Sequence, residues 1–157
     1  MDTQVSTIPP ASGPTSEERN WAMAAHLSAL IAVIGFPFGH VVGPLVVYLA
    51  KGKESPFVAS HARASMNYQI TISLAAIVAA IVAVFNFAVF IGFAGVSSSH
   101  GDDAGTAAGI GIVGIWAAAI LVIVAFVVVS LVFIILGTVA ASEGRPYRYP
   151  FAINFFR

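Results

Sequence analysis

Two long stretches of this sequence contain no Asp, Glu, Lys or Arg. They cover residues 64–101 and 104–142. A helix needs about 20 apolar residues to cross the hydrocarbon core of a bilayer, and each stretch is long enough. A backbone run of this length in an apolar medium must satisfy its hydrogen bonds internally, which a helix does. The stretches therefore predict two membrane-spanning helices, at about residues 66–93 and 110–141.

Composition supports this interpretation. The chain of 157 residues is 59% hydrophobic and 9% charged, whereas soluble domains carry about 25% charged residues. Its formal net charge is zero, so nothing in the charge balance indicates a nucleic-acid partner. It has no cysteine, which excludes disulfides and thiolate metal sites. We expect one all-α membrane domain, residues 21–157, whose surroundings are the lipid bilayer.

Residues 21–49 form a further apolar segment and are expected to be the first of three crossings. Pro37 and Pro44 interrupt it, and each proline removes a backbone donor, so the segment is expected to kink at both. The alternative is a re-entrant hairpin that turns at residues 35–39, whose second arm is short for a crossing. Residues 1–20 read as a disordered polar tail.

The distribution of positive residues predicts the orientation. With three crossings, six of the seven fall on one side: Lys51, Lys53, Arg63, Arg145, Arg148 and Arg157. Positive residues favour the cytoplasmic side, so we expect a multi-pass protein of the bacterial cytoplasmic (inner) membrane with its C-terminus in the cytoplasm. The N-terminal tail and Arg19 would then lie outside. A re-entrant first segment would instead place the N-terminus in the cytoplasm.

Ser55-Pro56 reads as an N-cap followed by proline at the first helical position. Beyond it, polar residues recur at four-residue spacing in two lines. One line consists of His61, Ser65, Gln69 and Ser73, and the other of Arg63, Asn67 and Thr71. Together with His26 and His40, these residues either line an aqueous vestibule or hydrogen-bond neighbouring helices.

Histidines in membrane segments often have a function, and binding of haem or a metal ion is one interpretation. The two later spans contain no histidine, methionine or cysteine beyond Ile70 to serve as a second ligand. His26 and His40 are about 21 Å apart along a straight helix, too far to share a metal. We therefore expect no metal and no cofactor. The acidic residues fall in predicted loops without a catalytic constellation, so we expect no enzyme.

Aromatic and cationic side chains follow the last predicted span, within residues 143–157. Such residues prefer the headgroup region, so this tail is expected to lie on the membrane surface. The expected lipid-interface anchors are Tyr147, Arg148, Tyr149, Phe155 and Phe156.

Several short motifs resemble a known family. They are Ala-His-Leu-Ser-Ala-Leu at 25–30, Gly-Pro-Leu-Val-Val-Tyr-Leu at 43–49, Ser-Pro-Phe-Val at 55–58 with the polar residues after it, and Tyr-Arg-Tyr-Pro at 147–150. They resemble a widespread family of small bacterial membrane proteins of unknown function, distantly similar to the Tic-twenty component of chloroplast inner-envelope protein import. The sequence departs from the family pattern at Ala64 and Asn154. The resemblance implies a compact helical membrane domain.

The function expected from these features is that of a non-enzymatic membrane protein that acts through helix packing with itself or with other membrane proteins. The alternative is an oligomeric pore or translocation component for a solute or a polypeptide.

Overall fold

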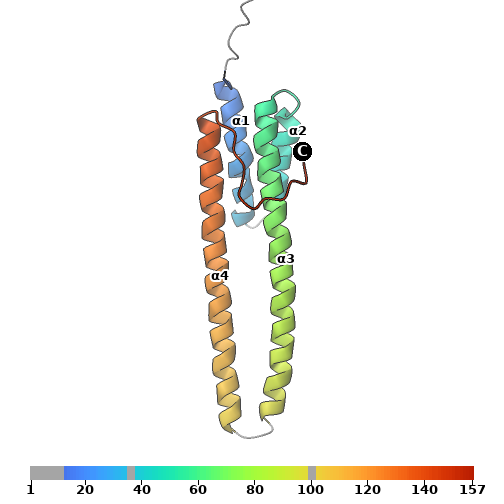
Figure 1. Ribbon diagram of the computed structural model, residues 1–157, viewed down its shortest axis with the longest axis vertical. Helices are drawn as coiled ribbons and strands as arrows, with labels where there is room; N and C mark the ends of the chain where they lie inside the picture. The colour runs from blue at the N-terminus through green and yellow to red at the C-terminus, as the bar shows by residue number, and fades with distance from the viewer. Residues whose placement is uncertain (1–12, 35–37, 99–101) are drawn as a thin grey trace, which may run out of the picture.

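The computed structural model describes residues 13–34, 38–98 and 102–157, and in these the regular secondary structure is entirely helical. Figure 1 shows how the elements are arranged. They are α1 (Ser16–Leu27), the 3-10 helix η1 (Ser28–Ile34), α2 (Gly39–Lys51), α3 (Pro56–Ser98) and α4 (Asp102–Ser142). Ser55 accepts a hydrogen bond from the backbone N–H of Val58, so the N-cap expected before Pro56 is confirmed.

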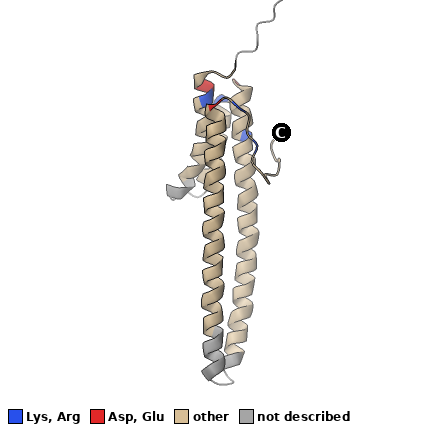
Figure 2. Cartoon of the chain, turned by 60° about the vertical axis from the view of Figure 1, so that its left-hand side comes forward, with Lys and Arg blue, Asp and Glu red and all other residues tan. Residues whose placement is uncertain are grey.

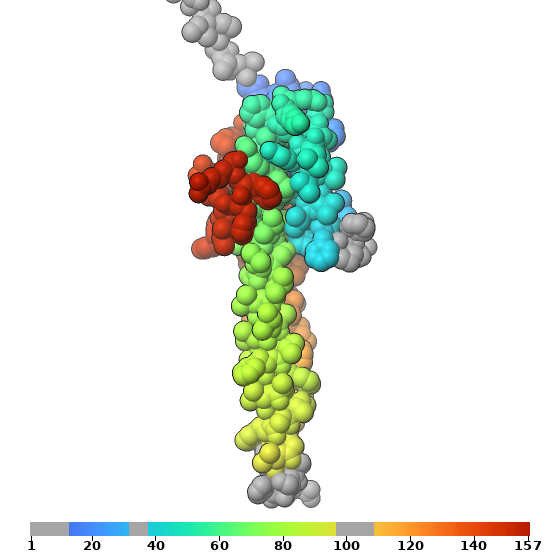
Figure 3. Space-filling model, turned by 90° about the vertical axis from the view of Figure 1, so that its right-hand side faces the viewer, coloured from blue at the N-terminus to red at the C-terminus, as the bar shows by residue number. Residues whose placement is uncertain are grey.

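The molecule has a wide end and a narrow end. α3 and α4 lie antiparallel over their whole length, and α1, η1 and α2 pack against one end of this pair (Figure 1). We call that end the head; it also holds the tail, residues 143–157. The rest of the pair, residues 74–98 and 102–129, is the stalk. In Figure 3 the width drops abruptly where the head meets the stalk.

Two helices, not three, are long and apolar enough to cross a membrane. They correspond to Pro56–Val96 and Gly109–Ser142. The predicted single crossing by residues 21–49 is wrong: the segment splits into α1 with η1 and a returning α2 of 13 residues. At 1.5 Å per residue α2 is about 20 Å long, too short to cross. The two arms pack against each other as in a hairpin, which was the alternative, and residues 35–37 of its expected turn lie outside the described residues.

Close packing of small residues holds the hairpin together. A Cβ at Gly43 of α2 would lie 2.6 Å from the Cβ of Ser28, so only glycine allows the two arms this approach. Pro44 is buried beside it, and α2 continues through this residue. The expected kink at Pro37 lies outside the described residues. Phe38 opens α2 with a φ of 62°, a left-handed conformation that L residues rarely adopt.

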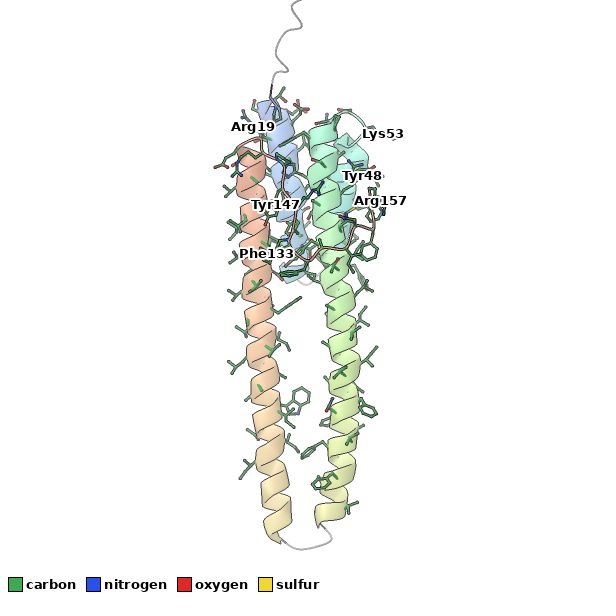
Figure 4. All side chains as sticks on the ribbon, in the orientation of Figure 1. Arg19, Tyr48, Lys53, Phe133, Tyr147 and Arg157 are labelled. Carbon is green, nitrogen blue, oxygen red and sulfur yellow. The ribbon has the colours of Figure 1, made fainter. Side chains whose placement is uncertain are left out.

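Because α2 runs back along α1, the start of α1 lies beside the end of α2 and the start of α3. Lys51 Nζ lies 3.4 Å from a carboxylate oxygen of Glu17, and Ser55 donates a 2.6 Å hydrogen bond to Glu18. Figure 4 shows Arg19 and Lys53 at the same end. The expectation that Arg19 lies on the opposite side from Lys53 is therefore wrong, because the segment between them reverses direction instead of crossing.

The stalk side chains that the structure describes are mostly apolar. In Figure 2 the coloured Lys, Arg, Asp and Glu residues all lie in the head. Along the stalk, large apolar side chains face outwards; Val84, Phe85, Val113 and Leu121 are each 69–70% exposed. Residues 74–98 span about 38 Å at 1.5 Å per residue, somewhat more than the hydrocarbon thickness of about 30 Å.

Candidate functional site

Three side chains from distant parts of the sequence form a hydrogen-bonded network inside the head. His26 of α1 lies 2.8 Å from the Tyr149 hydroxyl through Nδ1 and 2.8 Å from His61 Nδ1 through Nε2. His61, on α3, also contacts the carbonyl oxygen of Arg145 at 3.1 Å. Both histidines are fully buried and Tyr149 is 5% exposed. The network therefore joins α1, α3 and the tail.

The partners determine where the protons lie. The Arg145 carbonyl can only accept, so His61 Nε2–H donates to it. In a neutral His61 ring, Nδ1 then accepts from His26 Nε2–H, and His26 Nδ1 accepts from the Tyr149 hydroxyl. Every ring nitrogen of two neutral histidines is satisfied in this arrangement. An additional proton on His61 Nδ1 would face the N–H of His26 Nε2, and one on His26 Nδ1 would require the Tyr149 hydroxyl to turn from donor to acceptor.

Aromatic rings and one glycine enclose the network. The ring of Tyr68 stacks on Tyr149, with centroids 4.3 Å apart and planes at 12°. Tyr147 meets His26 edge-on at 6.0 Å. On α4, a Cβ at Gly137 would lie 2.9 Å from His26 Nδ1 and 3.1 Å from the Tyr147 ring. Glycine at this position therefore allows α4 to pack directly on the network.

Burial shifts the pKa values of the network away from their ordinary ranges. Desolvation, with a smaller contribution from His61, lowers the pKa of His26 from 6.5 to about 3. Desolvation also raises the pKa of the Tyr149 hydroxyl, against an opposing effect of the nearby Ser65 hydroxyl. Both groups are therefore neutral near pH 7, which agrees with the proton positions given by the geometry.

The first polar line of α3 faces the head interior. After His61, the side chains of Ser65 and Gln69 are buried, and Gln69 Nε2 has no hydrogen-bond partner among the residues that the structure describes. Ser73 donates to the Gln69 carbonyl and accepts a 2.8 Å hydrogen bond from His40 Nε2. His40 thus fixes α2 to α3 where the head meets the stalk.

The second polar line holds the C-terminal tail. Asn67 Oδ1 accepts from the backbone N–H groups of Phe155 and Phe156, and its Nδ2 donates to the Phe156 carbonyl, all within 2.9–3.0 Å. Thr71 accepts from the N–H of residue 153 at 2.9 Å, and Arg63 donates to the carbonyl of residue 157 at 3.2 Å. Both lines therefore include side chains that make contacts between segments of the chain.

The expected lipid anchors lie in different environments. Arg148, Phe155 and Phe156 are exposed, and Tyr147 is partly buried. Tyr149 lies in the interior, where its hydroxyl donates to His26 and its ring has no access to lipid. Within the part of the chain that the structure describes, no three His, Asp or Glu side chains gather closely enough to hold a metal ion.

Sequence reasoning singled out His26 and His61 but did not pair them. If residues 21–49 were one helix, His26 would lie far from the start of α3. The hairpin instead brings the rings of His26 and His61 together. Tyr149 was assigned to lipid because it follows an apolar helix and neighbours an arginine. Tyr147 and Tyr149 are two positions apart in the tail, and their rings lie in different environments. This spacing was the signal that could have indicated a buried tyrosine.

The fold and the buried network define a class: a small helical protein with a compact polar-cored head and two long apolar helices suited to a membrane. The family model of the magnetosome magnetite crystal formation protein family matches residues 17–156, and the chain belongs to that family. No curated protein and no solved structure matches the chain, and no similarity to Tic-twenty is found.

Proposed function

We propose that this chain is a non-enzymatic integral membrane protein that acts by packing its stalk against another copy of itself or against other membrane proteins. The observation that carries this proposal is a cleft between α3 and α4 in the stalk, with a volume of about 550 Å³. Small residues on both helices, such as Ala79, Ala83 and Ala119, line it. Small side chains let a third helix approach the backbones closely.

A single amide gives the cleft polar character. Asn86 lines it and donates a 2.8 Å hydrogen bond to the Val82 carbonyl, and its own carbonyl oxygen and second N–H make no hydrogen bond to the residues that the structure describes. Trp116 faces the same space, with its ring 5.9 Å from Phe87. Polar side chains in apolar surroundings favour partners that complete their hydrogen bonds, and an amide on a docked helix would do so.

We place the stalk in the bacterial cytoplasmic membrane and the head, with the C-terminus, on the cytoplasmic side. All seven Lys and Arg residues belong to the head in this fold, and positive residues favour the cytoplasmic face. The description of the family adds a process, magnetite crystal formation. We include it in the proposal as the process that such packing of membrane proteins would serve.

The test is cross-linking in native membranes. Single cysteines at Phe90, which lines the cleft, and at Val84, which does not, report on the two faces of α3 in a chain that has no native thiol. We expect Phe90→Cys to give cross-linked dimers or complexes with other membrane proteins, and Val84→Cys to give few. Asn86→Leu should weaken association by about 1 kcal/mol, roughly five-fold, whereas Asn86→Gln should retain most of it.

Equal cross-linking from both positions, unaffected by Asn86→Leu, would contradict the proposal. The alternative function, an oligomeric pore or translocation component, depends on the same measurement. Two candidate spans enclose no route by themselves, so a chain that stays monomeric in lipid would exclude the pore as well.

A further inference from the structure

Two phenylalanines combine an unfavourable backbone conformation with an unfavourable exposure. Among the described residues, Phe38 and Phe151 are the only non-glycine residues with positive φ, each at 62°. Phe38 is 73% exposed and Phe151 is 92% exposed. Such a conformation is strained in a bulky residue, and an exposed ring gains nothing in water. An apolar environment for the rings would offset both costs.

Both phenylalanines belong to segments fixed at one level of α3. Two residues after Phe38, His40 hydrogen-bonds Ser73. Two residues after Phe151, the backbone N–H of Ile153 hydrogen-bonds Thr71. Figure 3 shows the beginning of α2 and the tail on opposite sides of α3, near the point where the head narrows to the stalk. Exposed apolar side chains thus surround the top of the stalk.

We propose that this collar, formed by Phe38, Phe151, Ile153, Phe155 and Phe156, inserts into the boundary between headgroups and acyl chains of one leaflet and sets the depth of the stalk in the bilayer. The inference rests on the proposed membrane insertion of the stalk and adds the surface that contacts the lipid headgroups. All five side chains are at least 43% exposed.

The surroundings of the collar match a bilayer surface on both sides. On the stalk side, large apolar side chains are exposed from Leu74 onwards, and Asn86 is an exposed polar residue among them. On the head side, Arg63 lies eight residues before Thr71, about 12 Å along α3, and its guanidinium is bonded to the end of the tail. Arg148 and Arg157 of the tail are exposed as well. Aromatic rings at the boundary with arginines just above them are typical of interfacial anchors.

The collar also explains how a helix pair longer than the bilayer thickness could take a defined position across the membrane. α3 has 43 residues, about 64 Å at 1.5 Å per residue, which is roughly twice the hydrocarbon thickness. Without a stop, a helix pair of this length has no defined position across the bilayer. With the collar at one surface, the stalk fills the bilayer and its far end reaches the opposite headgroups.

Tryptophan depth measurement tests the inference. The two native tryptophans, Trp21 and Trp116, are replaced by phenylalanine, and one reporter is added per variant: F38W or F151W. V84W, about 16 Å further along the stalk than Ser73, is the deep control. K53W at the far end of the head is the water control. The proteins are reconstituted in vesicles of phosphatidylethanolamine and phosphatidylglycerol that carry quenchers at the headgroup, at the acyl-chain terminus, or in the aqueous phase.

We expect both collar reporters to be quenched several-fold more by headgroup quenchers than by the other two, V84W by acyl-chain quenchers, and K53W by the aqueous quencher. Collar reporters that behave like K53W or like V84W would overturn the collar and leave the membrane placement of the stalk intact. Aqueous quenching of V84W would overturn both. The same four positions as single cysteines carrying an environment-sensitive dye give this readout with both native tryptophans retained.

Discussion

At the scale of single residues, the Tyr149 hydroxyl is the contact through which the tail joins the histidine pair. Tyr149→Phe removes the donor and leaves His26 Nδ1 buried without a partner, which costs about 1–2 kcal/mol. We expect a lower free energy of unfolding in detergent micelles. Tyr147→Phe is the matched control, because the Tyr147 hydroxyl makes no hydrogen bond among the described residues, and it should change stability by less than about 0.5 kcal/mol. Equal effects of the two substitutions would contradict this role of Tyr149.

The lowered pKa of His26 predicts how stability depends on pH. The folded head holds this ring neutral down to about pH 3, whereas the unfolded chain binds a proton below about 6.5. Stability is therefore full above pH 6.5 and falls as the pH drops, by about 2 kcal/mol at pH 5 for this group. Thermal unfolding between pH 5 and 8 measures the slope. His26→Gln should lower stability at pH 7 and flatten the profile; a slope unchanged by the substitution would refute the assignment.

At the scale of elements, the hairpin depends on the contact between Gly43 and Ser28. Gly43→Ala places a methyl group within 2.6–2.8 Å of Ser28 atoms and should destabilise the head by about 1–3 kcal/mol. Gly114→Ala is the control, since a Cβ there meets nothing within 4 Å. It should be neutral or slightly stabilising, because alanine favours helix. Protease sensitivity of the segment between α1 and α2 would report the difference; similar cleavage of both variants would argue against close packing as the constraint.

The tail depends on one side chain of α3. Asn67 makes three hydrogen bonds to the backbone of Phe155 and Phe156, so Asn67→Leu should release the last residues of the tail. Carboxypeptidase digestion should then remove residues 153–157 several-fold faster than in the wild type. Asn86→Leu, in the stalk, is the matched control for the loss of an asparagine. Digestion at the wild-type rate in Asn67→Leu would show that other contacts hold the tail.

Some elements followed from the sequence and others did not, for physical reasons. The two runs without charged residues predicted α3 and α4, because a helix that crosses a bilayer consists mainly of apolar residues. The Ser55-Pro56 cap predicted where α3 begins. Residues 21–49 are apolar throughout as well, and hydropathy does not distinguish one crossing from two short arms. The close approach at Gly43 decides this, and it is a tertiary contact. The hydrogen bonds of His26 to His61 and Tyr149, which are 35 and 123 positions away in the sequence, depend on the same fold.

At the scale of the whole molecule, the hairpin places the start of α1, the α2–α3 loop and the end of α4 at one end of the molecule, which is one side of the membrane in the proposed placement. The 3.4 Å contact between Glu17 and Lys51 requires this for the first two, and the network of His26 with the tail requires it for the third. Single cysteines at Gly13, Lys53 and Ser142 should therefore react alike with an impermeant thiol reagent: not in intact cells, and fully in inverted membrane vesicles. With three crossings, Gly13→Cys would instead react from outside while Lys53→Cys stayed protected. Labelling of Gly13→Cys alone in intact cells would thus refute the hairpin, whereas labelling of all three would keep the hairpin and reverse the orientation.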